Sequence, residues 1–514
     1  MNLTHGEDRI LDQVRLRFVK ETGTDPIRIE AEQAGPERFA VIVVGRPADL
    51  YKEALLNVGQ QLPDDHPFKG RIRLSYETPR DSMQGPEVEL LRSLIGRSLS
   101  VSPATADAAH RVEFAPFVGG KDLELMQQAN HVVVGRRGTG KSSLILATLR
   151  RLYERGESGV WIDMQRYHKR DDLQAVAQVI GEILAGLGNQ TKDSAIEDSI
   201  KSMEHFANRG DLTEAEVRRY LPRVALQIRQ ILTRANRAFY VFMDDVHLIA
   251  PTLQPLLVDM VYSLARGSNV WLKLAYVRNL AVVYDPVRQV GLNIPNDAQL
   301  VTLDQTLVDP AGARDHLMSI LRLFLNRCGY STPTELVGGE AVERLVWCSA
   351  GVPRDFLALF SDGLRIARES GHKRLGVQDV NVATGEFAAI RMQQLPGEFS
   401  GSEAMIRAAL DEVQSFCLDE SRNNAFLALL EPGHPGYKTL VMLADLRFVH
   451  LLHPSITAGR AGVRYEAYLL DYSFYTGMRR RQNITEVKIE GERPKRAELR
   501  RLPRLDLERL NAVQ

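Results

Sequence analysis

A chain of 514 residues is too long for one ordinary hydrophobic core, so we expect two to four domains. Hydrophobic residues make up 44% of it and charged residues 25%, close to globular averages, which excludes wholesale disorder. Lysine and arginine together number 65, and so do aspartate and glutamate. The whole molecule therefore has no net field to attract nucleic acid or an anionic membrane, and any basic surface must be local.

The cysteines and the first residues bear on where the protein works. Cys328, Cys348 and Cys417 lie far apart, which excludes a disulfide framework and a cysteine zinc site and suits a reducing compartment. The chain does not begin with a basic segment followed by an apolar one. No stretch approaches the roughly 18–20 apolar residues that span a bilayer. We expect a soluble, cytoplasmic protein with no membrane partner.

Residues 1–110 have the pattern of a small α/β accessory domain. An amphipathic segment with Ile10, Val14 and Phe18 precedes an apolar run from Phe39 to Val44. A helix over 47–62, a strand over 72–76 and a helix around 88–95 follow. The segment 98–109 is rich in Ser, Ala, Thr and Asp and is typical of a linker.

Between residues 111 and 305, short apolar strands alternate with helical segments. The expected strands cover 132–134, 160–162, 239–243, 270–276 and 300–302. Continuous apolar strands separated by helices predict a parallel sheet with both faces covered. We expect the strand at 270–276 to lie between the strands at 132–134 and 239–243.

The rest of the chain divides at Pro396 and Gly397. Residues 306–395 are mainly helical, with Leu317, Ile320, Leu321 and Phe324 at helical spacing. Residues 396–514 hold helices, then strands at 448–452 and 465–470 on either side of a turn at 458–462. Helices followed by a hairpin indicate a winged-helix-like C-terminal domain.

A glycine-rich loop follows the first of these parallel strands. The segment fits G-x-x-x-x-G-K-[ST] at Gly135, Gly140, Lys141 and Ser142, with an apolar strand before it and an apolar helix after it. The glycines let consecutive N–H groups face a polyphosphate, and the helix presents its positive end to the same anion. We predict that Lys141 reaches the β- and γ-phosphates of ATP and that Ser142 holds Mg²⁺. The predicted nucleotide contacts are Gly135, Arg136, Arg137, Gly138, Thr139, Gly140, Lys141, Ser142 and Ser143.

A second acidic element comes about a hundred residues later. The apolar strand at 239–243 ends in Asp244 and Asp245. We expect Asp244 to lie near Mg²⁺ and Asp245 to polarise the attacking water. His247 follows, and a structural hydrogen-bonding role is favoured for it over a catalytic one.

Further candidates lie at the ends of later elements. Tyr276, Arg278 or Asn279 would contact the γ-phosphate from the end of the inserted strand, and the sequence does not choose among them. Arg288 fits an arginine finger for a neighbouring subunit, although a plain surface arginine is the commoner case. Arg354, after Gly351 and Pro353, is interpreted as a residue that reads the γ-phosphate; a purely structural helix start is the alternative.

Taken together, these residues resemble the AAA+ ATPases, and within them the origin-recognition initiator branch and its bacterial relatives. The segment from Phe117 and Val118 through Glu124 is similar to the box that precedes the P-loop and lines the adenine pocket, with Gly120 where that box usually has Arg. Gly351, Pro353 and Arg354 match the sensor-2 motif of the branch. Asp245 replaces the usual Glu, which implies slow, switch-like turnover. Some bacterial relatives resemble mobile-element or phage-defence components.

The resemblance implies an α/β fold with four parts. These are an N-terminal α/β domain (1–110), a P-loop parallel-sheet ATPase core (111–305), a helical lid (306–395) and a winged-helix-like domain with a basic tail (396–514). Such relatives bind duplex DNA through the last domain. Arg460, Arg464, Arg479–Arg481 and the cations at 495–504 are the candidates here, against a solvated charged tail as the alternative.

Three functions remain open. The first is an ATP-hydrolysing switch that couples nucleotide state to assembly on DNA or a partner protein. The second is a STAND-like signalling ATPase, in which nucleotide controls oligomerisation of an N-terminal effector or sensor. The third is a scaffold that holds nucleotide without turnover. Stimulation by duplex DNA, concentration-dependent assembly, and tight binding without phosphate release distinguish them.

Overall fold

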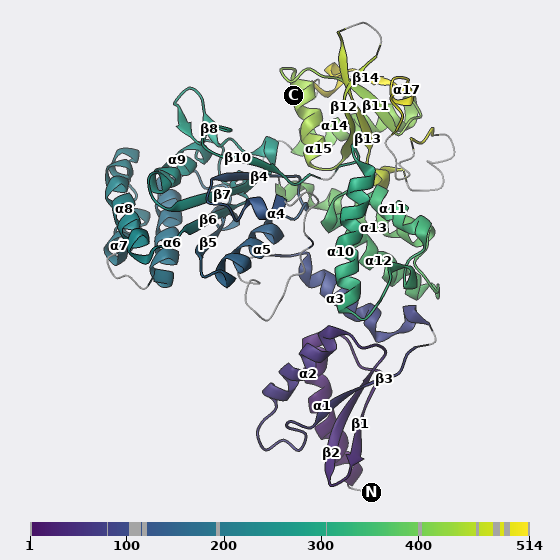
Figure 1. Cartoon of the computed structure of the whole chain (residues 1–514). Helices are drawn as coiled ribbons and strands as arrows, with labels where there is room; N and C mark the ends of the chain where they lie inside the picture. Colours follow the sequence, from purple (N-terminus) through teal and green to yellow (C-terminus); the bar gives the residue numbers. More distant parts are fainter. Residues whose placement is uncertain are drawn as a thin grey trace. The chain divides into compact units, whose positions relative to one another are not determined.

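The chain forms two compact units in a computed structural model (Figure 1). One unit comprises Val101–Gln305 and Val441–Arg447; the other comprises Met1–Ser100, Thr306–Leu440 and Phe448–Gln514. The structure describes residues 3–79, 81–101, 115, 121–191, 196–304, 306–398, 403–458, 462–475, 484–487 and 494–511. The division into four domains stays a prediction.

A five-stranded parallel sheet organises the first unit. Its strands are β4 (His131–Val134), β5 (Ser158–Asp163), β6 (Phe239–Asp244), β7 (Val270–Tyr276) and β10 (Gln299–Thr302), in the order β10-β4-β7-β6-β5. The expected insertion of β7 between β4 and β6 is therefore confirmed. Because the strands are parallel, their carboxyl ends meet at one edge, with Val134 opposite Tyr276 and Asp163 opposite Asp244.

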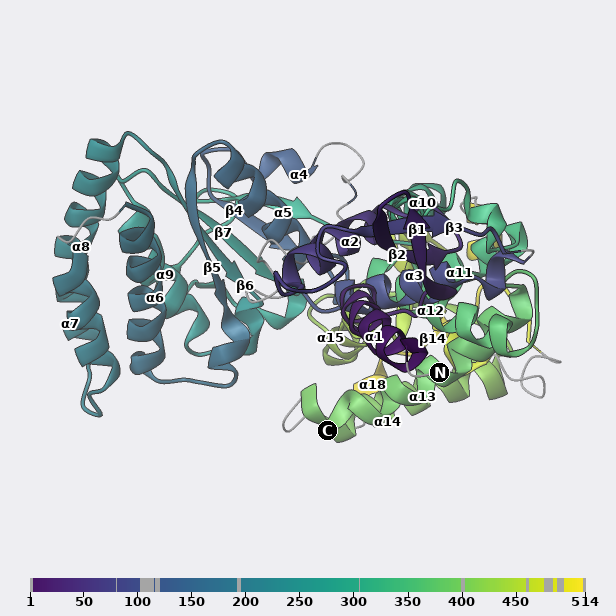
Figure 2. The same cartoon turned by 90° about the horizontal axis from the view of Figure 1, so that it is seen from below.

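Helices cover both faces of this sheet, as the apolar strands require (Figure 2). Helix α5 packs on one face, with Leu144, Ile145 and Leu149 against Val133 and Phe242. Helices α6, α8 and α9 bury their apolar sides on the other face. The unit's helices and its small hairpin are α4 (Lys121–Glu124), α5 (Lys141–Glu154), α6 (Leu173–Thr191), α7 (Glu197–Ala207), α8 (Glu214–Ala235), α9 (Gln254–Ala265), β8 (Tyr284–Asp285) and β9 (Val290–Gly291).

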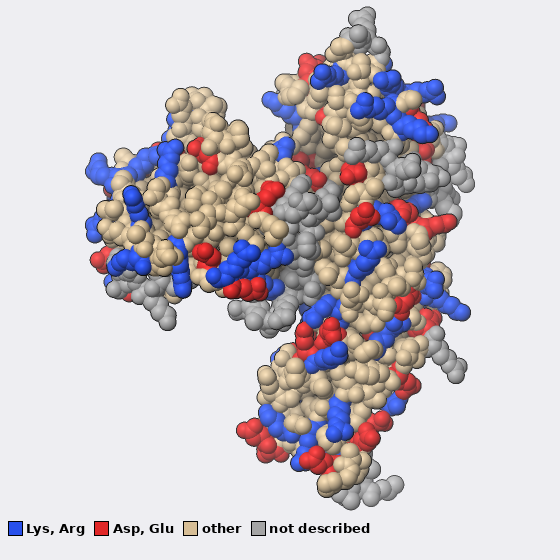
Figure 3. Space-filling view, viewed as in Figure 1, with Lys and Arg blue, Asp and Glu red and all other residues tan. Residues whose placement is uncertain are grey.

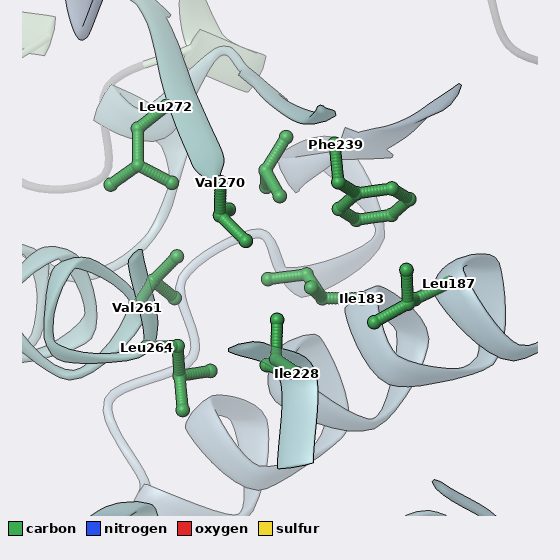
Figure 4. Close-up of a pocket in the computed structure, with 9 residues that line it drawn as sticks. Ile183, Leu187, Ile228, Phe239, Val261, Leu264, Val270 and Leu272 are labelled. Atoms are coloured by element: carbon green, nitrogen blue, oxygen red, sulfur yellow. The ribbon is translucent and has the colours of Figure 1, made fainter. Parts of the chain in front are cut away.

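A small apolar cavity remains in the core between the sheet and helices α6, α8 and α9 (Figure 4). It has about 10 Å³ of free space and is lined only by apolar side chains from α6, α8, α9 and the amino ends of β6 and β7, among them Ile183, Phe239 and Val270. A space this size holds one water at most, and a water needs polar partners that these walls lack. The cavity is therefore a packing void and lies away from the carboxyl edge of the sheet.

The N-terminal part of the second unit is an α/β layer. Strand β2 is antiparallel to β1 and parallel to β3, and helices α1 and α2 contact this sheet. The predicted elements are present; their bounds, with β1 added, are α1 (Leu3–Thr22), β1 (Arg28–Ala34), β2 (Glu37–Val44), α2 (Asp49–Gln61), β3 (Ile72–Tyr76) and α3 (Pro86–Ser98). Strand β1 had no apolar signal because it is an edge strand with Arg28, Glu30 and Glu32 exposed.

Four helices confirm the helical region that follows: α10 (Pro310–Arg327), α11 (Gly339–Ser349), α12 (Pro353–Glu369) and α13 (Val377–Glu398). Helix α12 packs directly on α3 of the N-terminal part. Arg92 on α3 donates to the carbonyl oxygen of Ser361 on α12 at 3.2 Å, and Arg368 on α12 pairs with Glu89 on α3 at 3.0 Å. The N-terminal part is thus joined to these helices by direct helix packing, a hydrogen bond and an ion pair.

The C-terminal part runs helix, strand, helix and hairpin, which confirms the expected α/β fold class with a winged-helix-like end. Its sheet has the order β12-β13-β11-β14. The elements are α14 (Glu403–Ser415), β11 (Ala425–Leu429), α15 (Pro435–Asp445), β12 (Val449–Thr457), β13 (Arg464–Leu470), α17 (Arg496–Leu499), β14 (Arg504–Leu505) and α18 (Glu508–Asn511). Within the described segments, no helix is both long and apolar enough to cross a membrane.

Candidate nucleotide site

The glycine-rich loop lies between β4 and α5, where the sequence placed it. Gly138 and Gly140 have φ values of 80° and 94°, in the left-handed region that side chains disfavour. A Cβ on Gly135 would lie 2.5 Å from the Thr139 hydroxyl oxygen. At each of these three positions the loop therefore disfavours a residue with a side chain. Helix α5 starts directly at Lys141, so its free N–H groups open on this loop.

Lys141 is buried in the loop and bonds to its backbone. Its ammonium donates to the carbonyl oxygens of Gly135 at 2.9 Å and Arg136 at 3.2 Å. The Thr139 hydroxyl also donates to the Arg136 carbonyl, at 2.9 Å. These bonds hold the positive charge of Lys141 within the turn that the glycines form.

The acidic pair lies at the carboxyl end of β6. The Asp245 N–H donates to the Asp244 carboxylate at 3.0 Å, and Asp245 itself has a left-handed φ of 55°. Burial raises the pKa of Asp244 to about 7, and the Asp245 and Asp163 charges act in the same direction. A hydrogen bond from Ser142 and the Lys141 charge oppose this rise. Ser142 and Lys141 of the loop therefore interact with Asp244, the first aspartate of the pair.

Two further carboxylates at this edge had not been predicted. Asp163 ends β5 directly opposite Asp244. Asp304, just after β10, accepts from the Arg136 N–H at 2.8 Å and from its Nε at 3.4 Å. Both follow strands that the sequence had identified, so their position after a parallel strand was the available signal.

The side chain of His247, two residues after Asp245, is buried. Burial, with the Lys141 and Arg137 charges, lowers the pKa of His247 to about 3. Its imidazole is therefore neutral, and its 3.9 Å approach to Asp245 is not an ion pair. No described residue forms a hydrogen bond with its Nδ1, so the structural hydrogen bond favoured for this residue is not seen at that atom.

The candidates on the later elements differ in their surroundings. Burial raises the pKa of Tyr276 to about 12. Arg278 donates to the Thr302 hydroxyl at 3.1 Å, and the Asn279 amide donates to the Asp445 carboxylate at 2.8 Å. Arg288 follows β8 and pairs with Glu214 at 2.9 Å.

Burial raises the pKa of Asp445 to about 6, and Asp304 acts in the same direction while the Asn279 hydrogen bond opposes it. Asp445 belongs to the Val441–Arg447 segment of the same compact unit. The Asp445 carboxylate, from late in the chain, thus accepts a hydrogen bond from Asn279, one of the candidates for contact with the γ-phosphate.

The structure brings Lys141, Ser142, Asp244 and Asp245 together at one edge of the sheet. Phe117, Val118 and Gly120 lie outside the described residues. Arg354 is exposed in the first turn of α12, after Pro353, and belongs to the other compact unit. Among the described residues, no group of three or more His, Cys, Asp or Glu side chains forms a metal site by itself.

Several solved structures are similar to this chain at low sequence identity. No protein-family model matches the sequence, and no curated protein matches it. The chain is similar to the Orc1 protein of Aeropyrum pernix in complex with DNA, at 13% identity and a TM-score of 0.39, over 74% of this chain and 93% of that one. It is similar to Drosophila ORC bound to DNA, at 15% identity and a TM-score of 0.38, over 83% and 97%. The RuvB branch migration motor of Thermotoga maritima has 11% identity and a TM-score of 0.29, over 56% and 68%.

Proposed function

We propose that this chain binds and slowly hydrolyses ATP and that nucleotide state controls its assembly on DNA or on a partner protein. One observation carries the proposal: the strand–loop–helix from His131 to Glu154 encloses the Lys141 ammonium beside the Asp244 and Asp245 carboxylates. A loop of free N–H groups with a buried cation suits a polyphosphate. Paired carboxylates suit the metal and the water that accompany it.

Ser142 and Asp244 are the residues that would hold Mg²⁺. Hard oxygen donors suit this ion, and the Ser142 hydroxyl and the Asp244 carboxylate already form a hydrogen bond to each other. The raised pKa of Asp244 marks a buried carboxylate with too little positive charge around it. A divalent cation would supply that charge, and would neutralise phosphate oxygens during hydrolysis.

The remaining roles follow from position. Lys141 would exchange its bonds to Gly135 and Arg136 for bonds to the β- and γ-phosphates. Asp245 would orient and polarise the attacking water. Arg354, from the start of α12, would contact the γ-phosphate and report whether it is present. Phe117 and Val118 would border the adenine.

The coupled partner is duplex DNA or a protein, and the test is turnover. The full chain is assayed for ATP hydrolysis with and without duplex DNA, while its mass in solution is measured. Stimulation by DNA with a steep salt dependence supports a DNA-coupled switch. Assembly that depends on ATP and protein concentration but not on DNA would favour the STAND-like alternative. The contacts between α3 and α12 would then link Arg354 to the N-terminal part.

Tight ATP binding without phosphate release would instead indicate a nucleotide-holding scaffold and would refute the hydrolytic proposal. The proposal extends, through the sequence resemblance, to phage defence or mobile-element biology. Plaque counts on a host that expresses wild type or Lys141→Ala test that extension. Equal counts for the two proteins would contradict a nucleotide-dependent defence role.

A further inference from the structure

Helix α8 of the ATPase core has an unusual distribution of charge. Its only acidic residues, Glu214 and Glu216, lie in its first turn. From Val217 to Ala238 the chain has no acidic residue but six arginines: Arg218, Arg219, Arg223, Arg229, Arg234 and Arg237. The chain as a whole is neutral, so this is a local excess of positive charge.

The fold points these arginines away from the core. The buried side of α8 consists of Val217, Leu221, Val224, Ile228, Ile231 and Leu232. At 100° per residue, Arg219 and Arg223 lie on the opposite side, and Arg229 and Arg234 lie toward its two margins. Arg237 follows just after the helix ends, and all five of these residues are exposed. Figure 3 shows Lys and Arg side chains gathered where Figure 1 places α7 and α8. We call these five residues the arginine face.

The sixth arginine, Arg218, forms ion pairs within the fold. Arg218 pairs with Glu214 at 2.8 Å and with Asp259 at 2.7 Å, which ties α8 to α9. Within the described part of the chain, no carboxylate forms an ion pair with Arg219, Arg223, Arg229 or Arg237. Four like charges without counter-ions repel one another, so an anionic ligand would relieve a cost that the folded chain bears alone.

We infer that the arginine face of α8 binds the phosphate backbone of nucleic acid. From Arg219 to Arg234 the helix rises about 22 Å, at about 1.5 Å per residue. One strand of duplex DNA presents a phosphate about every 3.4 Å, so about six phosphates lie along that length. Guanidinium groups bind phosphate through two parallel N–H bonds, which suits this ligand better than lysine would.

An acidic membrane surface fits the helix less well. Helices that lie on membranes insert an apolar face between the lipids. The apolar face of α8 is already buried in the core, and Leu226, 55% exposed, is the large apolar side chain left among the arginines. The surface is distinct from the basic C-terminal tail. It rests on the proposed function in so far as that proposal names DNA as a partner, and it deepens the proposal by assigning a surface that binds DNA without ATP hydrolysis.

The test compares salt dependence of duplex DNA binding in the full chain. Arg219→Ala, Arg223→Ala and Arg234→Ala are combined in one variant, and binding is measured by fluorescence anisotropy at several salt concentrations. The slope of log K against log salt is negative, and each lost phosphate contact makes it shallower by about 0.9. We therefore expect the magnitude of the slope to decrease by about 2.7 in the triple alanine variant. A matched variant with Lys at the same three positions should retain most of the slope.

ATP-linked thermal stabilisation is measured on the same proteins. Because α8 lies outside the nucleotide loop, the alanine variant should keep that stabilisation, which separates this test from the proposed ATPase. An unchanged slope in a folded alanine variant overturns the inference. So does a variant that loses binding to phosphatidylserine vesicles while its DNA slope stays the same, since the face would then serve a membrane.

Discussion

The Lys141 ammonium donates to the carbonyl oxygen of Gly135 at 2.9 Å, from the start of α5 back to the end of β4. The bond closes the loop on itself and keeps a buried cation beside the helix N-terminus. An arriving polyphosphate would have to replace it, and the gain is a charge-assisted bond to phosphate in place of one to a neutral carbonyl. This exchange leads to the first prediction.

Lys141→Ala should abolish stabilisation by ATP. A ligand at a thousandfold excess over its dissociation constant stabilises the folded chain by about 4 kcal/mol, and the variant should show almost none of this. Thermal unfolding with and without Mg·ATP measures it. Lys201→Ala, on the exposed side of α7, serves as the control and should respond like wild type. Full stabilisation of the Lys141 variant would place the phosphate cradle elsewhere.

Asp245→Asn should keep ATP binding and lose hydrolysis. The amide keeps the shape of the carboxylate but is a far weaker base, so turnover should fall by about 10²–10⁴-fold. Phosphate release in single-turnover reactions measures the chemical step, and thermal stabilisation measures binding. Wild-type turnover in this variant would remove Asp245 from the reaction.

Glu87→Gln should change how stability depends on pH. Glu87 is buried and accepts from the Gly45 N–H at 2.7 Å and the Arg46 N–H at 3.0 Å. Burial raises the pKa of Glu87 above 4.5, so its contribution to stability is complete below pH 4.5 and is lost as pH rises through the raised value.

The glutamine should still accept both bonds but does not titrate. The free energy of unfolding of the variant should therefore rise relative to wild type as pH increases above 4.5. Urea unfolding at several pH values checks this. Parallel pH profiles for the two proteins would mean that Glu87 titrates normally.

Asp471→Asn should weaken the C-terminal part. Burial by itself would raise the pKa of Asp471, but Arg391 and His450 outweigh it and hold the pKa well below its usual range. The His450 ring lies 2.7 Å from this carboxylate and Arg391 lies 3.5 Å away. Removing one charge from such a buried group costs about 3–5 kcal/mol.

The pKa of Asp471 is lower in the folded chain than in the unfolded chain. The contribution of Asp471 to the free energy of unfolding is therefore present above about pH 3.8 and is lost as the pH falls below it. The difference in unfolding free energy between variant and wild type should therefore shrink on acidification below that value. Asp506→Asn, on the exposed surface near α18, is the control and should match wild type. If Asp471→Asn lowers the free energy of unfolding at neutral pH by less than about 1 kcal/mol, the assigned pairing is contradicted, since the loss of an exposed ion pair has an effect no larger than that.

Local pattern was sufficient for the parallel strands and for the loop residues. Apolar runs such as Val132–Val134 and Phe239–Met243 are strands in the structure. The glycine spacing before Lys141 also predicted the strand–loop–helix. It predicted these features because strand, turn and helix preferences act between residues close in the chain. Strand β1 was missed for the same reason, since its exposed charges conceal a strand that is defined by pairing with β2.

The sequence by itself determined which residues form the glycine-rich loop after β4 and which two aspartates follow the apolar run of β6. Only the tertiary structure decided that Asp163, Asp304 and Asp445 also converge on that region. Asp163 and Asp304 are brought there by the parallel register of β5 and β10, whereas Asp445 comes from the end of helix α15. It also decided which cations face solvent. The sequence drew attention to the basic tail, whereas the arginines of α8 gain significance because the core buries the other side of that helix. The neutral composition of the chain does not reveal such a surface, because the packing of the helices decides where charged side chains gather.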